Sequence, residues 1–112
     1  MRLTFLGKST QGGGSPTIYA TDRDTYVVQG WRVNGKPENI VEIPGTLLGY
    51  LIPGTALDAP LDPTGRRWRG DDGECATYTL SGQEVADAET LRQMSIPNHE
   101  RCIEVGRLRK EA

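Results

Sequence analysis

The chain has 112 residues, of which 36% are hydrophobic and 25% are charged, and its formal net charge is −2. This length and composition indicate one globular domain with a modest core. Nucleic-acid binders usually carry a basic excess, so the charge does not favour a polyanion as partner. The sequence contains no apolar run of 18 residues, and its N-terminus turns polar too soon for a secretory signal, so we expect a cytoplasmic protein with no membrane segment.

The first third of the chain predicts short strands. Residues 3–6 and 16–20 are β-rich, and residues 25–33 are dense in β-branched and aromatic side chains. The run Gly12-Gly13-Gly14-Ser15 lacks the Gly-Lys-Ser/Thr ending of a phosphate loop, so we interpret it as a hairpin connection. Gly30 inside the third strand indicates a bulge or a close approach of another backbone.

The middle of the chain is less regular. Asn34-Gly35 predicts a tight hairpin that returns into an antiparallel strand at residues 40–43. Residues 45–52 are apolar, and a run this short is compatible with either one or two helical turns or a strand. Residues 53–70 are rich in proline and glycine, which predicts a long surface connection.

The last third predicts a strand, a helix and a strand. Residues 75–80 and 101–105 are β-rich, and residues 86–94 are typical of a short helix. Asp87 is the expected N-cap of that helix, and Leu91 and Met94 are spaced to face the core together.

One pattern occurs twice. Residues 25–33 (TYVVQGWRV) and 77–85 (TYTLSGQEV) both fit Thr-Tyr-x-aliphatic-x-Gly-x-x-Val, and each is followed by a similar strand, ENIVEI at 38–43 and ERCIEV at 100–105. Chance similarity between strands is the alternative to a true duplication. We predict a single domain, 1–112, with a pseudo-repeat of 16–52 and 74–108 joined by residues 53–70. The expected fold is a β-rich α+β domain: a small antiparallel sheet or partly open barrel of two related strand-hairpin units, with one or two short helices.

Catalytic and metal-binding patterns are weak. His99 is the only histidine, and Cys102 lies three residues away, on the opposite face of an expected strand. Two cysteines and one histidine do not complete a zinc site without a carboxylate or a second chain. We therefore expect no catalytic residue, metal or cofactor. A carboxylate-based site among Asp22, Asp24 and Glu42 is the enzymatic alternative.

Two further features have ordinary explanations. Cys75 and Cys102 could form a disulfide if their strands are neighbours, but reduced thiols are the default in the cytoplasm. The acidic run at residues 71–74 lacks the ligand spacing of a calcium loop, so we expect a solvated turn.

The strongest candidate for a binding surface combines arginine with tryptophan. The run at residues 65–70 reads GRRWRG, and Trp31-Arg32 adds a second pair. Such a loop could be merely solvated, contact a protein or stack on nucleic-acid bases. Neighbouring acids offset its charge, which favours a protein over a polyanion. The candidate partner-binding residues are Trp31, Arg32, Arg66, Arg67, Trp68 and Arg69.

Other aromatic residues and the strand edges also bear on binding. We expect Phe5, Tyr19, Tyr26, Trp31, Tyr50 and Tyr78 to lie mostly in the core. Short strands leave a sheet edge that could pair with a second copy, giving a homodimer, or with an extended segment of a partner.

Three segments of the first half, FLGK at 5–8, SPTIYATDR at 15–23 and YVVQGW at 26–31, resemble a family of small uncharacterised actinobacterial proteins. Members have a short helix and an Ile-Pro…Val-Glu-Val-Pro ending after this motif, whereas here the corresponding helix and IP…CIEV ending occur only in the second half. Such proteins are often encoded beside helix-turn-helix regulators. The resemblance implies a non-enzymatic accessory protein in transcriptional or developmental regulation, with such a regulator as partner. The alternative is a small nucleic-acid-binding module that uses the predicted loop from Arg66 to Arg69.

Overall fold

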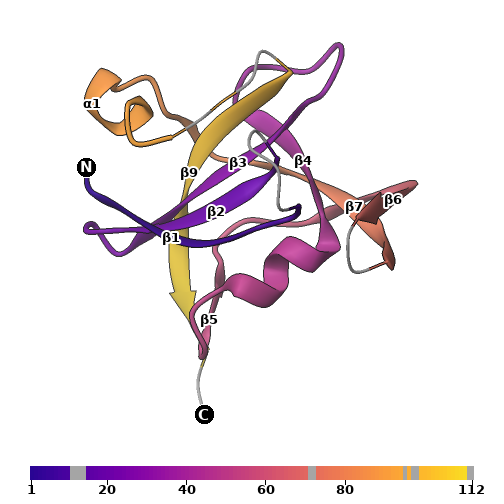
Figure 1. The fold of residues 1–112 in the computed structure, drawn as a ribbon, viewed down its shortest axis with the longest axis horizontal. Coiled ribbons are helices and arrows are strands. Elements are labelled where there is room, and N and C mark those ends of the chain that lie inside the picture. Colours follow the sequence, from indigo (N-terminus) through magenta and orange to yellow (C-terminus); the bar gives the residue numbers. More distant parts are fainter. Residues whose placement is uncertain (11–14, 71–72, 95, 97–98, 111–112) are drawn as a thin grey trace.

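The computed structural model describes residues 1–10, 15–70, 73–94, 96 and 99–110 (Figure 1). It is a β-rich fold in which all strand pairs are antiparallel. The main path of the sheet runs β1-β2-β3-β4-β7-β6, and β9 pairs with β3, β5 and β8. The strands are β1 Leu3–Lys8, β2 Thr17–Thr21, β3 Thr25–Arg32, β4 Ile40–Pro44, β5 Thr55–Leu57, β6 Asp62–Gly70, β7 Gly73–Ser81, β8 Gln83–Glu84 and β9 Glu100–Arg109.

Strand β3 lies at the centre of the fold because both of its faces are buried. Tyr26 and Val28 face the main core, whereas Val27 faces a second cluster with Tyr19 and Cys102. Alternate side chains of a strand point to opposite faces, so a continuously apolar strand must be covered on both sides. The other buried residues of the main core are Ile18, Val41, Ile43, Leu47, Leu57, Leu80, Ile103 and Val105.

Several local predictions are confirmed. Strands β3 and β4 form the expected antiparallel pair, and Gly35 between them has a positive φ of 76°. Residues 33–39 connect the two strands, so the connection is longer than the tight turn that Asn34-Gly35 predicted. The helix α1, Ala88–Leu91, is shorter than predicted, and the Asp87 side chain caps it by accepting from the backbone N–H of Thr90 at 3.0 Å. Residues 45–52 resolve as a short 3-10 helix, η1, Gly45–Tyr50. The described residues include no helix of the length and apolarity that crossing a membrane requires.

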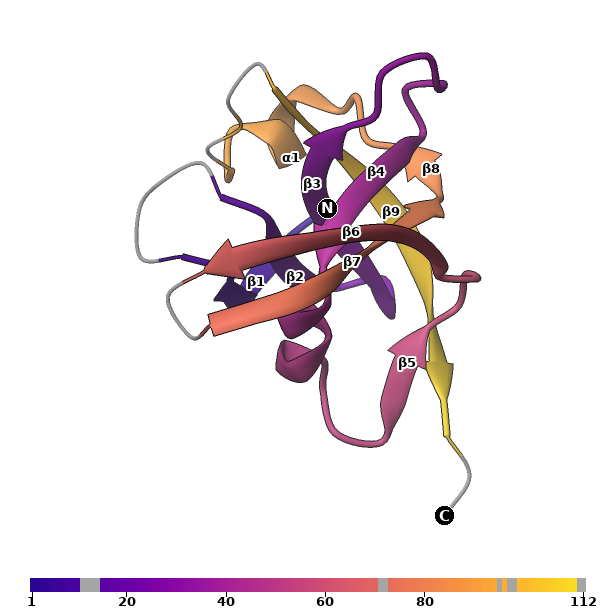
Figure 2. The same cartoon turned by 90° about the vertical axis from the view of Figure 1, so that its right-hand side faces the viewer.

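The interpretation of residues 53–70 as an irregular connection is wrong. This segment contains β5 and the nine-residue strand β6, which pairs with β7 (Figure 2). The segment from Arg66 to Arg69 is therefore a strand rather than a loop. Strand β6 is at the end of the main path of the sheet, and little of it is buried. Its sequence is therefore polar and contains glycine, and it lacks the apolar pattern that would predict a strand. The expected core positions of Phe5 and Tyr50 are also wrong, since these residues are 55% and 39% exposed.

Two sets of strands have matching partners. We call β2, β3 and β4 the first half, and β6, β7, β8 and β9 the second half. Trp31 of β3 lies opposite Glu42 of β4, and in the corresponding place Gln83 of β8 lies opposite Glu104 of β9. The next pairs along keep the register: Arg32 with Val41, and Glu84 with Ile103.

The two halves are joined by crossed pairing. Strand β3 of the first half pairs with β9 of the second, where Tyr26 lies opposite Val105. Strand β7 of the second half pairs with β4 of the first, where Tyr78 lies opposite Ile43. These are the positions that the sequence pattern aligns, so each half contributes its final strand to the sheet of the other.

The match extends to two glycines but not to every side chain. A Cβ atom on Gly30 would lie 2.7 Å from the carbonyl oxygen of Glu42, and one on Gly82 would lie 2.6 Å from that of Glu104. Both glycines therefore allow the same close approach of the following strand. Tyr26 differs from its counterpart in the pattern, because Tyr26 is fully buried whereas Tyr78 is half-buried.

We predict that Gly30→Ala and Gly82→Ala each destabilise the fold, because either new methyl group would overlap a carbonyl oxygen of the neighbouring strand. Overpacking of this kind typically costs about 1–3 kcal/mol. Urea unfolding should reveal the loss. The matched control is Gly49→Ala, since no atom lies within 4 Å of the added methyl group there. Equal stabilities of Gly30→Ala and Gly49→Ala would contradict the close approach.

Candidate functional site

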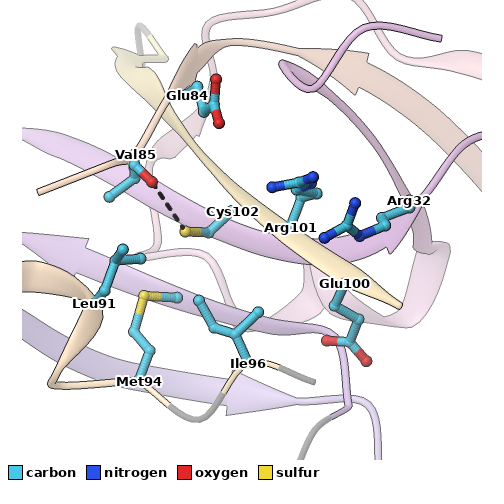
Figure 3. Close-up of a pocket in the computed structure, with 9 residues that line it drawn as sticks. All are labelled: Arg32, Glu84, Val85, Leu91, Met94, Ile96, Glu100, Arg101 and Cys102. Atoms are coloured by element: carbon cyan, nitrogen blue, oxygen red, sulfur yellow. Dashed lines mark hydrogen bonds between the residues drawn. The ribbon is translucent and has the colours of Figure 1, made fainter. Parts of the chain in front are cut away.

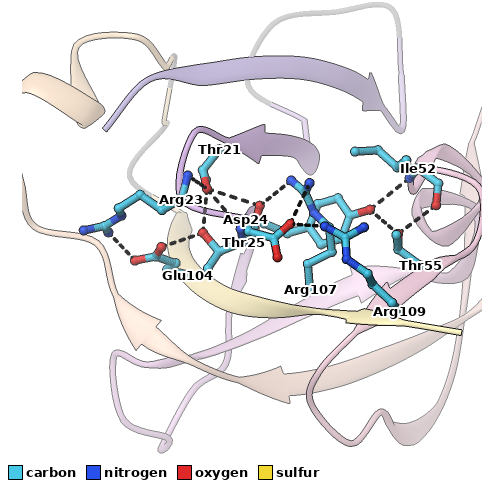
Figure 4. Close-up of polar contacts among 10 residues, drawn as sticks. Thr21, Arg23, Asp24, Thr25, Ile52, Thr55, Glu104, Arg107 and Arg109 are labelled. Atoms are coloured by element: carbon cyan, nitrogen blue, oxygen red, sulfur yellow. Dashed lines mark hydrogen bonds and ion pairs between the residues drawn. The ribbon is translucent and has the colours of Figure 1, made fainter.

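A cluster of polar side chains links the turn between β2 and β3 to β9. We call Thr21, Arg23, Thr25 and Glu104 the first polar cluster (Figure 4). The hydroxyl groups of Thr21 and Thr25 lie 2.7 Å apart, and Thr25 donates to Glu104 Oε2 at 2.6 Å. Arg23 Nη2 donates to Glu104 Oε1, also at 2.6 Å. The carboxylate of β9 thus fixes the turn of the other half.

The second half repeats this arrangement. We call Thr64, Arg66, Thr77 and Glu42 the second polar cluster. The hydroxyl groups of Thr64 and Thr77 lie 2.5 Å apart, and Thr77 donates to Glu42 Oε2 at 2.7 Å. Arg66 donates from both Nε and Nη2 to the two oxygens of Glu42. In each cluster, the backbone N–H of the arginine donates to the first threonine hydroxyl.

The ionisation of Glu42 follows from these contacts. Burial by itself would raise the pKa of Glu42, because it disfavours the charged carboxylate. Hydrogen bonds from Arg66 and Thr77, together with the guanidinium charge, outweigh burial and hold the pKa below its usual value. The carboxylate is therefore charged at neutral pH and holds Arg66 in place.

The two clusters differ in the length of chain between their threonines. Thr21 and Thr25 are 4 positions apart, whereas Thr64 and Thr77 are 13 apart. The extra residues extend the pairing of β6 with β7, and we call the described residues of this extension, 67–70 and 73–76, the arm. The arm carries Arg67, whose Nε donates to Glu74 at 2.7 Å.

The arm also places Trp68 against Trp31. Their ring centroids lie 5.8 Å apart at an interplanar angle of 48°. The Trp68 ring lies directly over Gly70, where a Cβ atom would be only 2.1 Å from the ring. In the first polar cluster, the residue that corresponds to Trp31 is Gln83, so the tryptophan pair belongs to the second cluster alone.

The tryptophan pair and the second polar cluster border a shallow hollow of about 350 Å³. Both indoles are half-buried, so each keeps part of its surface in contact with solvent. The side chain of Arg66 is 62% exposed although its guanidinium is bound to Glu42. The surface therefore offers flat aromatic area and an oriented cation. The hollow is lined by Trp31, Glu42, Arg66, Arg67, Trp68 and Thr77.

The structure brings together four of the six predicted binding residues: Trp31, Arg66, Arg67 and Trp68. Arg69 is exposed on the same strand, opposite Glu74. Arg32 does not join them, since it lies 3.9 Å from Glu38 and lines a different hollow. Sequence reasoning missed Glu42 and Thr77 as parts of this surface. The repeated Thr-x-Arg pattern, at Thr21 and Thr64, was the available signal.

The remaining sequence candidates lie in separate surroundings. Asp24 pairs with Arg107 and Arg109, Asp22 accepts from the backbone N–H of Arg2, and Glu42 belongs to the second polar cluster. Both cysteines, Cys75 and Cys102, are free. Among the described residues, no three metal-ligating side chains cluster. Residues 12–14 of the glycine run and 71–72 of the acidic run lie outside the described part.

No protein-family model matches this chain, and neither a curated protein nor a solved structure matches it.

We predict that Glu42→Gln destabilises the protein at neutral pH by about 1.5 kcal/mol, the lower end for hydrogen bonds to a charged group, because Arg66 is well exposed. Since folding lowers the pKa of Glu42, its stabilising effect is complete above the unfolded pKa and is lost as the pH falls through the folded pKa. Urea unfolding at pH 7 and pH 3 should therefore show the wild-type advantage shrinking in acid.

A matched control for this experiment is Glu74→Gln. Glu74 and its partner Arg67 are both about half exposed, so we expect a loss well under 1 kcal/mol. A Glu42→Gln deficit that stays constant from neutral to acid pH would contradict the role assigned to the Glu42 charge.

Proposed function

We propose that this protein is a non-enzymatic, cytoplasmic binding protein that recognises another protein through its arm. The observation that carries the proposal is the asymmetry between two otherwise matching turns. Three residues suffice to join Thr21 to Thr25, so the core does not require a longer connection at the second position. The additional chain instead presents a tryptophan against a second tryptophan at the surface.

The chemistry of the arm favours a protein partner. Tryptophan and arginine are enriched among the residues that dominate binding energies at protein interfaces. Arg66 and Arg67 already pair with Glu42 and Glu74, which reduces the net positive charge available to a polyanion. Nucleic-acid binding by residues 66–69 is thus the less favoured alternative, and it would weaken steeply with salt.

The first partner to test is a helix-turn-helix regulator. The motifs in the first half resemble small actinobacterial proteins that are often encoded beside such regulators. An accessory role in transcriptional or developmental regulation follows from that resemblance. A homodimer formed through the edge of β6 is the competing use of the same surface.

We also infer that the two halves arose from copies of one strand-hairpin unit that exchange their final strands. Three independent features support this: the shared sequence pattern, the identical strand registers and the repeated polar cluster. The matching contacts of the second half begin at Asp62, which lies opposite Thr79 just as Tyr19 lies opposite Val27. The second copy thus starts inside the segment first interpreted as a connection.

An arm replacement tests the inference that the two turns are equivalent. Joining Thr64 to Thr77 by Asp-Arg-Asp, the sequence between Thr21 and Thr25, should give a protein that unfolds cooperatively with a core like that of the wild type. The reason is that the same turn already closes the matching position. Urea unfolding and amide NMR spectra provide the measurement. A variant that does not fold would contradict the equivalence of the two turns.

Partner binding is tested with a neighbouring regulator and with lysate of an actinobacterial host. We expect Trp68→Ala to weaken binding about 30-fold or more, as is usual for a buried tryptophan at an interface. Calorimetry or a pull-down with the purified partner measures the loss. The matched control is Arg23→Ala, which removes the corresponding arginine of the first polar cluster and should leave binding unchanged. Equal effects of Trp68→Ala and Arg23→Ala, or no protein partner together with a strictly monomeric protein, would overturn the proposal.

A further inference from the structure

A second hollow, of about 360 Å³, lies between β9 and the segment that contains α1 (Figure 3). This segment is the other place where the two halves differ, since residues 33–39 alone join the corresponding strands of the first half. The volume is within the range of about 300–1,000 Å³ that is usual for small-molecule sites. The lining residues are Arg32, Glu84, Val85, Leu91, Met94, Ile96, Glu100, Arg101 and Cys102.

One wall of this hollow is apolar. Val85, Leu91 and Met94 pack with the second hydrophobic cluster, which includes buried Cys102. The Cys102 thiol donates to the carbonyl oxygen of Val85 at 3.9 Å, and burial raises its pKa to about 11. The thiol is therefore neutral at physiological pH, and this wall carries no charge.

Two guanidinium groups lie across the hollow from this wall (Figure 3). Arg32 and Arg101 both lie within ion-pair distance of Glu38 Oε2, and the Arg32 separation of 3.9 Å is too long for a hydrogen bond. Two guanidinium groups offer ten N–H donors, whereas one carboxylate accepts about four hydrogen bonds. This wall therefore keeps N–H donors for a further hydrogen-bond acceptor.

Two acidic side chains also border the hollow. The Glu100 side chain is wholly buried, and its Oε1 accepts from Gln29 Nε2 at 2.7 Å while its Oε2 lies 3.3 Å from His99 Nε2. Oε1 is thus hydrogen-bonded, whereas Oε2 is buried and accepts no hydrogen bond from the described residues. Glu84 is on the exposed two-residue strand β8.

We propose that this hollow binds a small monocarboxylic acid with an apolar body. The carboxylate would accept hydrogen bonds from the guanidinium groups of Arg32 and Arg101. The apolar body would lie against Val85, Leu91 and Met94. Apolar walls with a few oriented polar groups are typical of small-ligand sites. This site is independent of the arm, so it neither requires nor tests the proposed protein partner.

The test uses octanoate, octanol and octylammonium with the full-length chain. Calorimetry should show that octanoate binds at least tenfold more tightly than the other two, and that Arg101→Gln weakens octanoate binding at least fivefold. Arg32→Gln should act in the same direction, and its side chain is 43% exposed, so folding should tolerate the change. The control, Arg109→Gln, removes an arginine that pairs with Asp24 elsewhere and should have no effect.

The location of binding is checked by the rate at which a thiol reagent modifies Cys102, measured in a Cys75→Ser background. Octanoate should slow that reaction by a factor that follows its occupancy. Absence of octanoate binding, equal affinities for octanoate and octanol, or binding that leaves the Cys102 rate unchanged would each overturn the proposal.

Discussion

The crossed pairing of the two halves is the constraint on which the rest of the structure depends. Strand β9 completes the sheet around β3, and β4 completes the sheet around β7. Each junction carries a threonine-to-glutamate hydrogen bond, from Thr25 to Glu104 and from Thr77 to Glu42. A buried carboxylate costs free energy unless it is hydrogen-bonded or paired. Each half supplies hydrogen-bond donors to the glutamate of the other half.

This constraint explains how the two polar clusters can match while the connections between their threonines differ in length. The turn between paired strands must deliver a threonine and an arginine to the glutamate, but the chain beyond them is free to lengthen. At the first polar cluster, the connection stays at its minimum. At the second, the connection grows into the arm and brings Trp68 over Trp31. A rigid scaffold that tolerates change in its connections is a common basis for binding function.

The sequence predicted the elements whose signals are local. Asn34-Gly35 indicated the hairpin, Asp87 indicated the helix cap, and the repeated Thr-Tyr pattern indicated strands that the structure places in matching register. It did not predict β6, because an edge strand has little buried surface and so lacks alternation of apolar residues. The partners of each strand could not be predicted either, since a pattern along one strand does not specify which other strand it joins.

The candidate site was also predictable only where its signal was local. Arginine and tryptophan in one run marked the arm as a candidate, but the role of Trp31 depends on a contact between strands far apart in the chain. The sequence marked Glu42 only as part of a carboxylate-based site with Asp22 and Asp24. In fact it is only 8% exposed, and its burial is tolerable only because Arg66 and Thr77 arrive from the other half.

The position of β9 has a consequence for synthesis of the protein. Strand β9 pairs with three other strands, and one of them, β3, begins 75 residues before it. Contacts between such distant segments slow folding, because a long loop must be closed before any of them forms. In a nascent chain on the ribosome, the backbone N–H and C=O groups along one edge of β3 would stay unpaired until β9 emerged. Newly made molecules should therefore depend on chaperones more than the modest size of the domain suggests.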